Sequence, residues 1–418
     1  MEKIFIKTYG CTHNQSDSEF MAGLLEQEGF KLVDDEASSD LIIINTCTVK
    51  DPSEKKFFFE LENIKKPVVV AGCIPQSEQN NPKLQNYSLV GVKQIERIAE
   101  VVKQTLQGNK VRFLNQSNDQ SLNLPRIRKN SLIEIIPISS GCLGQCTFCK
   151  TKFARGSLVS FKEEAIIKQA RAALNEGVKE IWLTSEDTGA YGLDIKTSLP
   201  HLLKELLKIN KDYKVRLGMI NPEYVIEYVD ELVEIYQYKK MFKFIHIPVQ
   251  SGNDRILKLM KRPYTIKDFR KVVHHMTKLI PTLTISTDII CGFPTETEEE
   301  FQDTMNLVKE MKFPVLNISK FYPRPRTLAA KMIPLDTMIK KARSKKLTNL
   351  NKTHISNAEW IGWEGEIIVD DVGNEDSFLG RTNSYRQIVV RGKNLFGKHL
   401  KVRVVDICRD YFVGSKIE

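Results

Sequence analysis

The sequence contains no hydrophobic segment long enough to cross a lipid bilayer. Its longest apolar runs, such as 41–44 and 68–71, have the length of buried strands, whereas a membrane-spanning helix needs about 20 apolar residues. A strand pattern follows the first residues directly, without the apolar region of a secretory signal. We therefore expect a cytoplasmic protein with no membrane partner.

Acidic residues are scarcer than basic ones. The chain has 52 Asp and Glu against 62 Lys and Arg, a formal net charge of +10, and its pI is about 9.0. This charge favours a polyanionic partner, nucleic acid first, although a merely solubilising surface is the alternative. With 418 residues, 41% of them hydrophobic, the chain can form two or three packed domains.

Cysteine is also scarce, and in a reducing compartment the eight cysteines are better explained as metal ligands than as disulfides. Cys142, Cys146 and Cys149 are separated by three and then two residues. One loop can thus present three thiolates to a four-iron cluster, which normally takes four, and leave one iron open. Zinc is the alternative, but no second Cys-x-x-Cys pair or spaced histidine pair follows.

Residues 1–115 alternate between strand and helix patterns, which predicts an α/β domain with a parallel sheet. We expect strands at 3–8, 40–45 and 67–71, and helices at 15–28, 52–64 and 94–106. Cys11, Cys47 and Cys73 each follow the end of one of these strands. Because such strand ends share one edge of the sheet, we expect the three thiols to converge on a second cluster. Three unrelated buried cysteines are the alternative.

The middle of the chain predicts a linker and then a barrel. Residues 116–130 are polar and aperiodic, which is typical of a solvated linker. From 131 to 350, six strand–helix units predict a (β/α) barrel or partial barrel. Its strands are expected at 132–138, 180–184, 214–218, 243–248, 282–288 and 315–319. The loop of Cys142 follows the first strand, at the end where such barrels keep their active sites.

The last part, 351–418, has short β patterns with glycine turns, which predict a small β-barrel. Before it, residues 337–358 contain six Lys or Arg and no acidic residue. Such a run is either a solvated helix face or, beside RNA, a track for phosphates. The predicted RNA-binding residues are Lys340, Lys341, Arg343, Lys345, Lys346 and, in the small barrel, Arg381.

The Cys-x-x-x-Cys-x-x-Cys pattern, with Phe148 before its last cysteine, resembles that of the radical S-adenosylmethionine (radical-SAM) enzymes. The resemblance implies a six-unit partial barrel in which the open iron binds the amine and carboxylate of SAM. Reductive cleavage of SAM then yields a 5′-deoxyadenosyl radical. The cofactor contacts implied by the resemblance come from Phe148, Glu186, Arg216 and Gln250.

Further strings, at 8–19, 246–253 and 288–297, resemble the methylthiotransferase branch of that family. The first is closest to the archaeal and eukaryotic enzymes for threonylcarbamoyladenosine in tRNA. The string at 379–385 resembles a TRAM domain, an oligonucleotide-binding-like module that grips tRNA. Two positions depart from the family: Cys291 replaces a usual valine, and Arg326 replaces a usual glycine. We interpret Cys291 as a small core residue.

The resemblance implies transfer of a methylthio group to adenine C2 of N6-threonylcarbamoyladenosine, at position 37 in the anticodon stem-loop of tRNA. The implied cofactors are SAM and two 4Fe–4S clusters, with Cys142, Cys146 and Cys149 on the SAM-binding cluster and the other triad on an auxiliary one. An external low-potential reductant and a sulfur donor are implied partners. Alternatives are isopentenyladenosine in tRNA, a ribosomal-protein aspartate, or a non-catalytic iron–sulfur RNA-binding protein.

Overall fold

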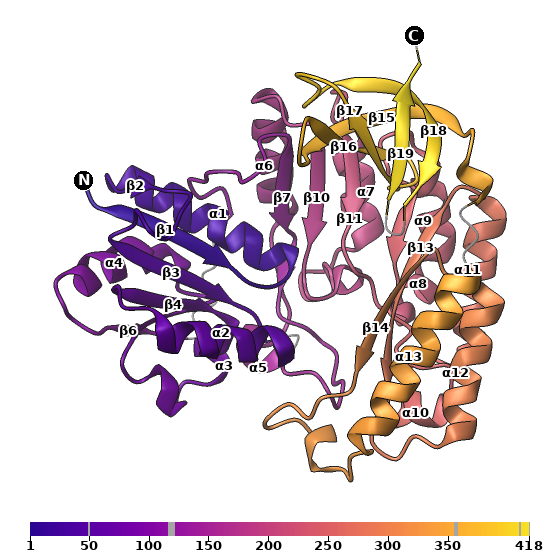
Figure 1. The fold of residues 1–418 in the computed structure, drawn as a ribbon, viewed down its shortest axis with the longest axis horizontal. Coiled ribbons are helices and arrows are strands. Elements are labelled where there is room, and N and C mark those ends of the chain that lie inside the picture. The colour runs from indigo at the N-terminus through magenta and orange to yellow at the C-terminus, as the bar shows by residue number, and fades with distance from the viewer. Residues whose placement is uncertain (49–50, 116–121, 355–357, 409–410, 418) are drawn as a thin grey trace.

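The computed structural model describes residues 1–48, 51–115, 122–354, 358–408 and 411–417. The chain folds into an N-terminal α/β domain, a central open barrel and a small C-terminal β-barrel (Figure 1). None of the helices in these ranges is long and apolar enough to cross a membrane.

The N-terminal domain is built on a parallel sheet with strand order β2-β1-β3-β4-β5-β6. Its strands are β1 (Lys3–Thr8), β2 (Lys31–Leu32), β3 (Leu41–Thr46), β4 (Val68–Gly72), β5 (Ser88–Gly91) and β6 (Arg112–Phe113). Helices α1 (Thr12–Gln27) and α4 (Ile98–Leu106) pack on one face, and α2 (Asp51–Asn63) and α3 (Cys73–Ser77) pack on the other. Central strand β3 is fully buried, which explains its continuous apolar sequence.

The central domain confirms the expected six-unit partial barrel. Its parallel strands are β7 (Ile133–Pro137), β10 (Glu180–Thr184), β11 (Lys214–Leu217), β12 (Phe244–His246), β13 (Thr284–Cys291) and β14 (Val315–Lys320). They form two three-stranded sheets, joined by bridges such as Met219–His246 between β11 and β12. The covering helices are α6 (Glu163–Asn175), α7 (Leu199–Leu207), α8 (Pro222–Glu227), α9 (Val229–Gln237), α10 (Asp254–Leu259), α11 (Ile266–Leu279) and α12 (Glu298–Met311).

No pairing joins β7 to β14 among the described residues, and the N-terminal domain lies along β7 instead. Helix α1 contacts this edge strand, where the Ser16 hydroxyl donates to the Ile135 carbonyl at 3.3 Å. The N-terminal domain therefore provides hydrogen-bond partners for part of the β7 backbone, which would otherwise be an unpaired sheet edge.

The segment between these two domains differs from the predicted solvated linker. In the part that the structure describes, Arg126 packs its backbone against Gly23 of α1 and its side chain is buried. Arg126 and Arg128 both form ion pairs with the buried carboxylate of Glu134 in β7. No local pattern indicates this packing, because the partner of the segment is a glycine on a distant helix.

Helix α13 (Thr337–His354) packs on α12 and β14 of the central domain and leads to a closed barrel with strand order β15-β16-β17-β19-β18. Its strands are β15 (Glu364–Val372), β16 (Ser377–Thr382), β17 (Gln387–Arg391), β18 (His399–Ile407) and β19 (Phe412–Lys416). This confirms the expected small β-barrel, which has an apolar core of its own.

The small barrel docks on the amino-terminal ends of the central strands. The carbonyl of Asn383 accepts a hydrogen bond from the Lys243 amide at 2.7 Å, and its side chain accepts one from Lys214 at 2.8 Å. Tyr385 inserts its ring among Trp182, Phe242 and Phe244, with centroids 4.9 to 6.3 Å apart. The cluster loop of Cys142 lies beyond the opposite ends of these strands.

Candidate iron–sulfur centres

The first candidate centre lies at the carboxyl ends of β1, β3 and β4. Cys11 immediately precedes α1, Cys47 follows β3, and Cys73 is the first residue of α3. Gly10 has a φ of +118°, and a Cβ there would lie 2.5 Å from the Cys47 Cβ. The backbone beside Cys11 therefore contacts Cys47 at a distance that only glycine permits.

The thiols of this triad interact electrostatically. Desolvation, together with the neighbouring Cys47, raises the pKa of Cys11 to about 11. Desolvation, together with Cys47 and Cys11, likewise raises the pKa of Cys73 to about 12. The three cysteines that the sequence places after separate strands thus lie together, with Cys47 and Cys73 buried and Cys11 at the exposed side of the site. Such a site disfavours thiolates unless a cation or metal compensates them.

The second candidate centre is the loop that follows β7. The amide of Gly144 donates to the Cys142 sulfur at 3.2 Å, and the amide of Thr151 donates to the Cys149 sulfur at 3.4 Å. Thr147 anchors the loop to the end of α10, because its hydroxyl donates to the Leu259 carbonyl at 2.8 Å. Amide donors that point at sulfur stabilise the thiolate, which is the form that binds iron.

Both triads fit an iron–sulfur cluster better than one shared ion. In the described ranges, no three His, Cys, Asp or Glu side chains are close enough to hold a single metal ion. A four-iron cube tolerates a wider spacing, because each thiolate binds a different iron. Three cysteines in each place also leave one iron of such a cube for another ligand.

A buried network of charges lies between the two cysteine loops. Glu186, just after β10, accepts a hydrogen bond from the Gly141 amide at 2.8 Å and pairs with His13 at 3.0 Å and with Arg155 at 3.4 Å. Burial acts to raise the pKa of Glu186, but His13 and Arg155 outweigh it, and the pKa is lowered. The carboxylate expected to face the SAM ammonium is therefore engaged with protein groups.

The other predicted cofactor contacts differ in where they lie. Arg216 stacks over Trp182, Phe244 and Tyr385, at the barrel end next to the small β-barrel, so its predicted contact with the SAM carboxylate is corrected. Its guanidinium stays there because three aromatic faces attract the cation. Phe148 packs in an apolar cluster with residues such as Phe293.

Gln250 is the predicted contact that fits best. It is 9% exposed and its backbone has a φ of +68°. Its side-chain carbonyl oxygen is buried and has no hydrogen-bond partner among the residues that the structure describes. Since buried polar atoms are normally paired, this oxygen is suited to a ligand.

The sequence did not reveal Arg262 as a site residue. Its guanidinium is 6% exposed and donates to the Cys146 sulfur at 3.3 Å and to the Asn221 side chain at 2.7 Å. Asn221 in turn donates its backbone amide to Asp187 at 3.1 Å. Burial raises the pKa of Asp187 to about 7. An arginine more than 100 positions from a cysteine motif, in an ordinary loop, carries no local signal.

Comparison with known proteins places this geometry in a family. Residues 136–308 match the radical SAM superfamily, and residues 3–90 match uncharacterized protein family UPF0004. The threonylcarbamoyladenosine tRNA methylthiotransferase of Drosophila pseudoobscura pseudoobscura is 45% identical over 100% of this chain and 78% of its own length. The chain belongs to the threonylcarbamoyladenosine tRNA methylthiotransferase family.

Other members of the family lie in distant organisms. The human threonylcarbamoyladenosine tRNA methylthiotransferase is 42% identical over 100% of this chain and 74% of its own length. The probable enzyme of Pyrococcus horikoshii is 36% identical over the full length of both chains. Among solved structures, the radical S-adenosylmethionine methyltransferase TsrM from Kitasatospora setae has a TM-score of 0.57. It is 12% identical and covers 78% of this chain and 74% of its own, so it supports the fold alone.

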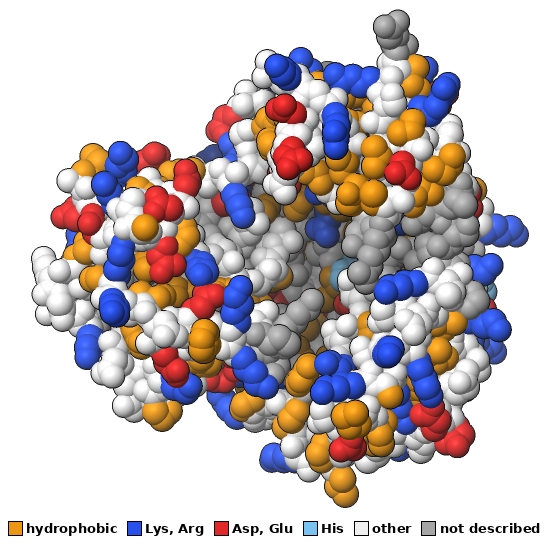
Figure 2. All heavy atoms as spheres, in the orientation of Figure 1, with side chains coloured by type: hydrophobic (Ala, Val, Ile, Leu, Met, Phe, Trp, Pro, Cys, Tyr) orange, Lys and Arg blue, Asp and Glu red, His pale blue; other side chains and the backbone are white. Residues whose placement is uncertain are grey.

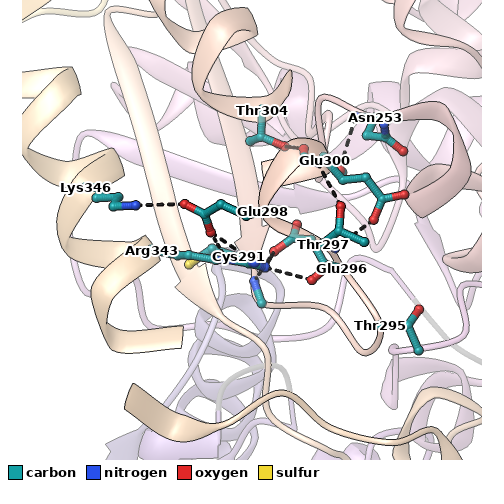
Figure 3. Close-up of polar contacts among 12 residues, drawn as sticks. Asn253, Cys291, Thr295, Glu296, Thr297, Glu298, Glu300, Thr304, Arg343 and Lys346 are labelled. Atoms are coloured by element: carbon teal, nitrogen blue, oxygen red, sulfur yellow. Dashed lines mark hydrogen bonds and ion pairs between the residues drawn. The ribbon is translucent and has the colours of Figure 1, made fainter. Parts of the chain in front are cut away.

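In this family member, most of the predicted RNA-binding side chains serve other contacts. Figure 3 shows Arg343 of α13 directed at two acidic residues, Glu296 at 2.6 Å, which precedes α12, and Glu298 at 3.2 Å, which begins it. Lys346 pairs with Glu298 at 2.8 Å. These pairs fasten α13 to the barrel, so Arg343, which is 4% exposed, is corrected from an RNA contact to a structural one.

Two more basic residues need the same correction. Lys340 is 9% exposed and lays its aliphatic chain against Gly292. Arg381 forms an ion pair with the buried Asp370 and covers the ring of Tyr385. Of the predicted set, Lys341, Lys345 and Lys346 are exposed on α13, and Lys346 is the one that pairs with Glu298. Figure 2 shows Lys and Arg side chains around the hollow at the centre of the face drawn.

The two departures from the family pattern have distinct outcomes. Cys291 is 1% exposed, and its thiol donates to the Ser319 carbonyl at 3.3 Å, as a core residue does. Arg326 has a φ of +69°, a left-handed conformation that suits glycine. Its guanidinium donates to the Ser77 carbonyl at 3.0 Å and covers the ring of Phe153. This arginine therefore joins the end of the central barrel to the N-terminal domain.

Proposed function

We propose that this chain is a tRNA methylthiotransferase that converts N6-threonylcarbamoyladenosine at position 37 to its 2-methylthio derivative. The observation that carries the proposal is a pair of cysteine triads on adjacent loops, in a chain up to 45% identical to enzymes of that name. The names of these relatives favour threonylcarbamoyladenosine over isopentenyladenosine and over a protein aspartate.

The cysteines divide into two ligand sets. Cys142, Cys146 and Cys149 would hold the SAM-binding 4Fe–4S cluster, and the triad of Cys11, Cys47 and Cys73 would hold the auxiliary one. When bound, SAM and its cluster supply radical abstraction of hydrogen from an unactivated adenine carbon, which acid–base groups cannot achieve. The reaction also needs an external low-potential reductant and a sulfur donor.

The residues around the first set orient it and exclude water. Arg262 donates to the Cys146 sulfur, and Thr147 fixes the loop on the end of α10. The unpaired oxygen of Gln250 offers a polar contact for SAM. Because these groups are held by packing before any substrate arrives, they need little reorganisation when it binds.

For RNA binding, we propose that the small β-barrel is a TRAM domain and that it acts with Lys341 and Lys345. A base beside the anticodon is unpaired and can enter the barrel mouth at low cost. The corresponding domain boundaries are 1–115, 116–130 as the connecting segment, 131–350 and 351–418, and the compartment is the cytoplasm.

The decisive experiment is mass spectrometry of tRNA nucleosides from cells with and without this protein. We expect 2-methylthio-N6-threonylcarbamoyladenosine to disappear without it and its precursor to accumulate. An unchanged level of that nucleoside, or loss of the isopentenyl derivative instead, would refute the substrate. Anaerobic protein that releases no 5′-deoxyadenosine with SAM and dithionite would support a non-catalytic binding protein.

The RNA contacts have a separate test. Replacing Lys341 and Lys345 by alanine should weaken tRNA binding uniformly and reduce the slope of its salt dependence by about one unit for each phosphate that a lysine no longer neutralises. The matched control replaces Lys168 and Lys208, near α6 and α7, and should leave the salt dependence unchanged. Equal effects of both pairs would show only non-specific attraction.

A further inference from the structure

A single short helix connects the two cysteine triads. Helix α5 (Thr151–Arg155) begins two residues after Cys149 and packs against α3, whose first residue is Cys73. Ala154, which is fully buried, contacts Cys73 and Val92. The side of α5 near its end therefore faces the auxiliary triad, and its start belongs to the SAM-cluster loop.

Arg155, the last residue of α5, is 1% exposed. Its guanidinium contacts Asp17 of α1 at 2.6 Å and Glu186 at 3.4 Å. Helix α1 starts directly after Cys11, and Glu186 accepts the amide of Gly141, which precedes Cys142. One guanidinium is thus tied to the loops that carry both triads.

Arg155 lies beside the auxiliary triad. Ala154, the residue before it, packs with Cys73, and the Arg155 guanidinium pairs with Asp17 in the helix that begins after Cys11. A cluster bound by three thiolates is an anion, and a buried anion is costly unless a cation lies beside it. Arg155 is such a cation, and its burial keeps its charge unscreened by water.

We propose that Arg155 is a positioning residue that supplies the counter-charge of the auxiliary cluster and, through Glu186, fixes that cluster relative to the SAM-cluster loop. The proposal rests on the proposed function, because it takes Cys11, Cys47 and Cys73 as cluster ligands. It predicts that the reduction potential of this one cluster depends on the charge at position 155.

The test isolates the auxiliary cluster in the full-length chain. Cys142, Cys146 and Cys149 are replaced by alanine, the protein is reconstituted anaerobically, and the midpoint potential is measured by spectroscopic redox titration. In this parent, Arg155→Met should shift the reduction equilibrium at least tenfold towards the oxidised cluster, which is about 59 mV for one electron. Iron loss to a chelator should also be faster, whereas Arg155→Lys should retain most of the parent's midpoint.

Two further variants separate charge from folding. Asp17→Asn removes a carboxylate that competes for the guanidinium, so the midpoint should move in the opposite, more positive direction. Arg343→Met removes a buried arginine of the α12–α13 contact and should leave the midpoint unchanged. Together with Arg155→Lys, these variants decide the question even if Arg155→Met does not fold.

The outcomes distinguish this proposal from the proposed function. A parent that binds no iron would refute the auxiliary cluster itself, and with it any role of Arg155. A parent with normal iron content whose midpoint is the same in folded Arg155→Met would refute the role of Arg155 alone. Equal shifts in the methionine and lysine variants would assign the effect to packing and overturn the counter-charge.

Discussion

Replacing Tyr385 by alanine should undock the small β-barrel from the central domain. The Tyr385 ring is 4.9 Å from Phe244 and 5.0 Å from Phe242, centroid to centroid, and Arg381 and Arg216 lie over it at 4.7 and 5.4 Å. Loss of a large packed aromatic side chain costs about 3–5 kcal/mol. Because most of these partners belong to the other domain, we expect the loss to appear in docking rather than in the fold of the small barrel.

A loss of about 3 kcal/mol corresponds to more than a hundredfold change in the docking equilibrium. Hydrogen exchange measures this change directly, because the Lys243 amide donates across the domain contact to Asn383. Its exchange should be about a hundredfold faster in Tyr385→Ala. The amide of Ile138, which donates to Thr184 within the central barrel, should exchange at its original rate.

The matched control is Tyr385→Phe, which keeps the ring and should remain docked. A folded Tyr385→Ala protein with unchanged exchange at Lys243 would contradict the reasoning. It would mean that the polar contacts of Asn383 hold the domains together and that the ring contributes little.

Three further predictions concern the clusters, the pH dependence and the strained arginine. Cys47→Ala should keep SAM cleavage, measured as 5′-deoxyadenosine, but abolish methylthiolation of tRNA; equal loss of both would contradict the division of labour. Burial and the nearby Asp370 raise the pKa of Glu180 to about 7, so the folded state binds this proton more tightly. Protonation of Glu180 therefore contributes to the free energy of unfolding in full below about pH 4, and this contribution, ~3 kcal/mol at most, is lost as the pH rises to about 7. Denaturant titrations at a series of pH values should show this loss in wild type and not in Glu180→Gln. Arg326→Gly should change the free energy of unfolding by less than about 1 kcal/mol, since relief of a left-handed backbone offsets removal of the hydrogen bond to Ser77. The same substitution should speed hydrogen exchange in α3, which ends at Ser77. Slower exchange in α3 would instead show that Arg326 strains this junction.

The fold was predictable because the strand patterns are periodic and regularly spaced. The strands expected at 3–8 and 180–184 coincide with β1 and β10, and the six-unit barrel and small β-barrel are both present. Helix boundaries shifted: α1 begins at Thr12 rather than at residue 15, and its N-cap residue, Cys11, makes no side-chain capping bond that a sequence pattern could reveal. Short edge strands such as β2 carry too few residues for a pattern.

The cysteines of the site were predictable because strand ends in a parallel sheet share one edge. Side chains around them were not, since their partners come from distant parts of the chain. Arg262 reaches Cys146 from 116 positions away, and Arg155 reaches Asp17 from 138 positions away. The run of basic residues along α13 was also misleading. From the sequence, Arg343 resembles a phosphate contact, but in the structure it pairs with Glu296, just before α12, and with Glu298, the first residue of α12.

The docking of the small β-barrel at the amino-terminal ends of the strands fixes its distance from the cluster loop. The cluster loop follows the opposite end of β7, so the two are separated by at least the length of a strand such as β10, about five residues or ~17 Å. Stacked nucleotides advance ~3.4 Å each. If the small barrel grips tRNA as proposed, it would hold the RNA about five nucleotides away from the base that reacts, and the protein would act as a ruler along the RNA.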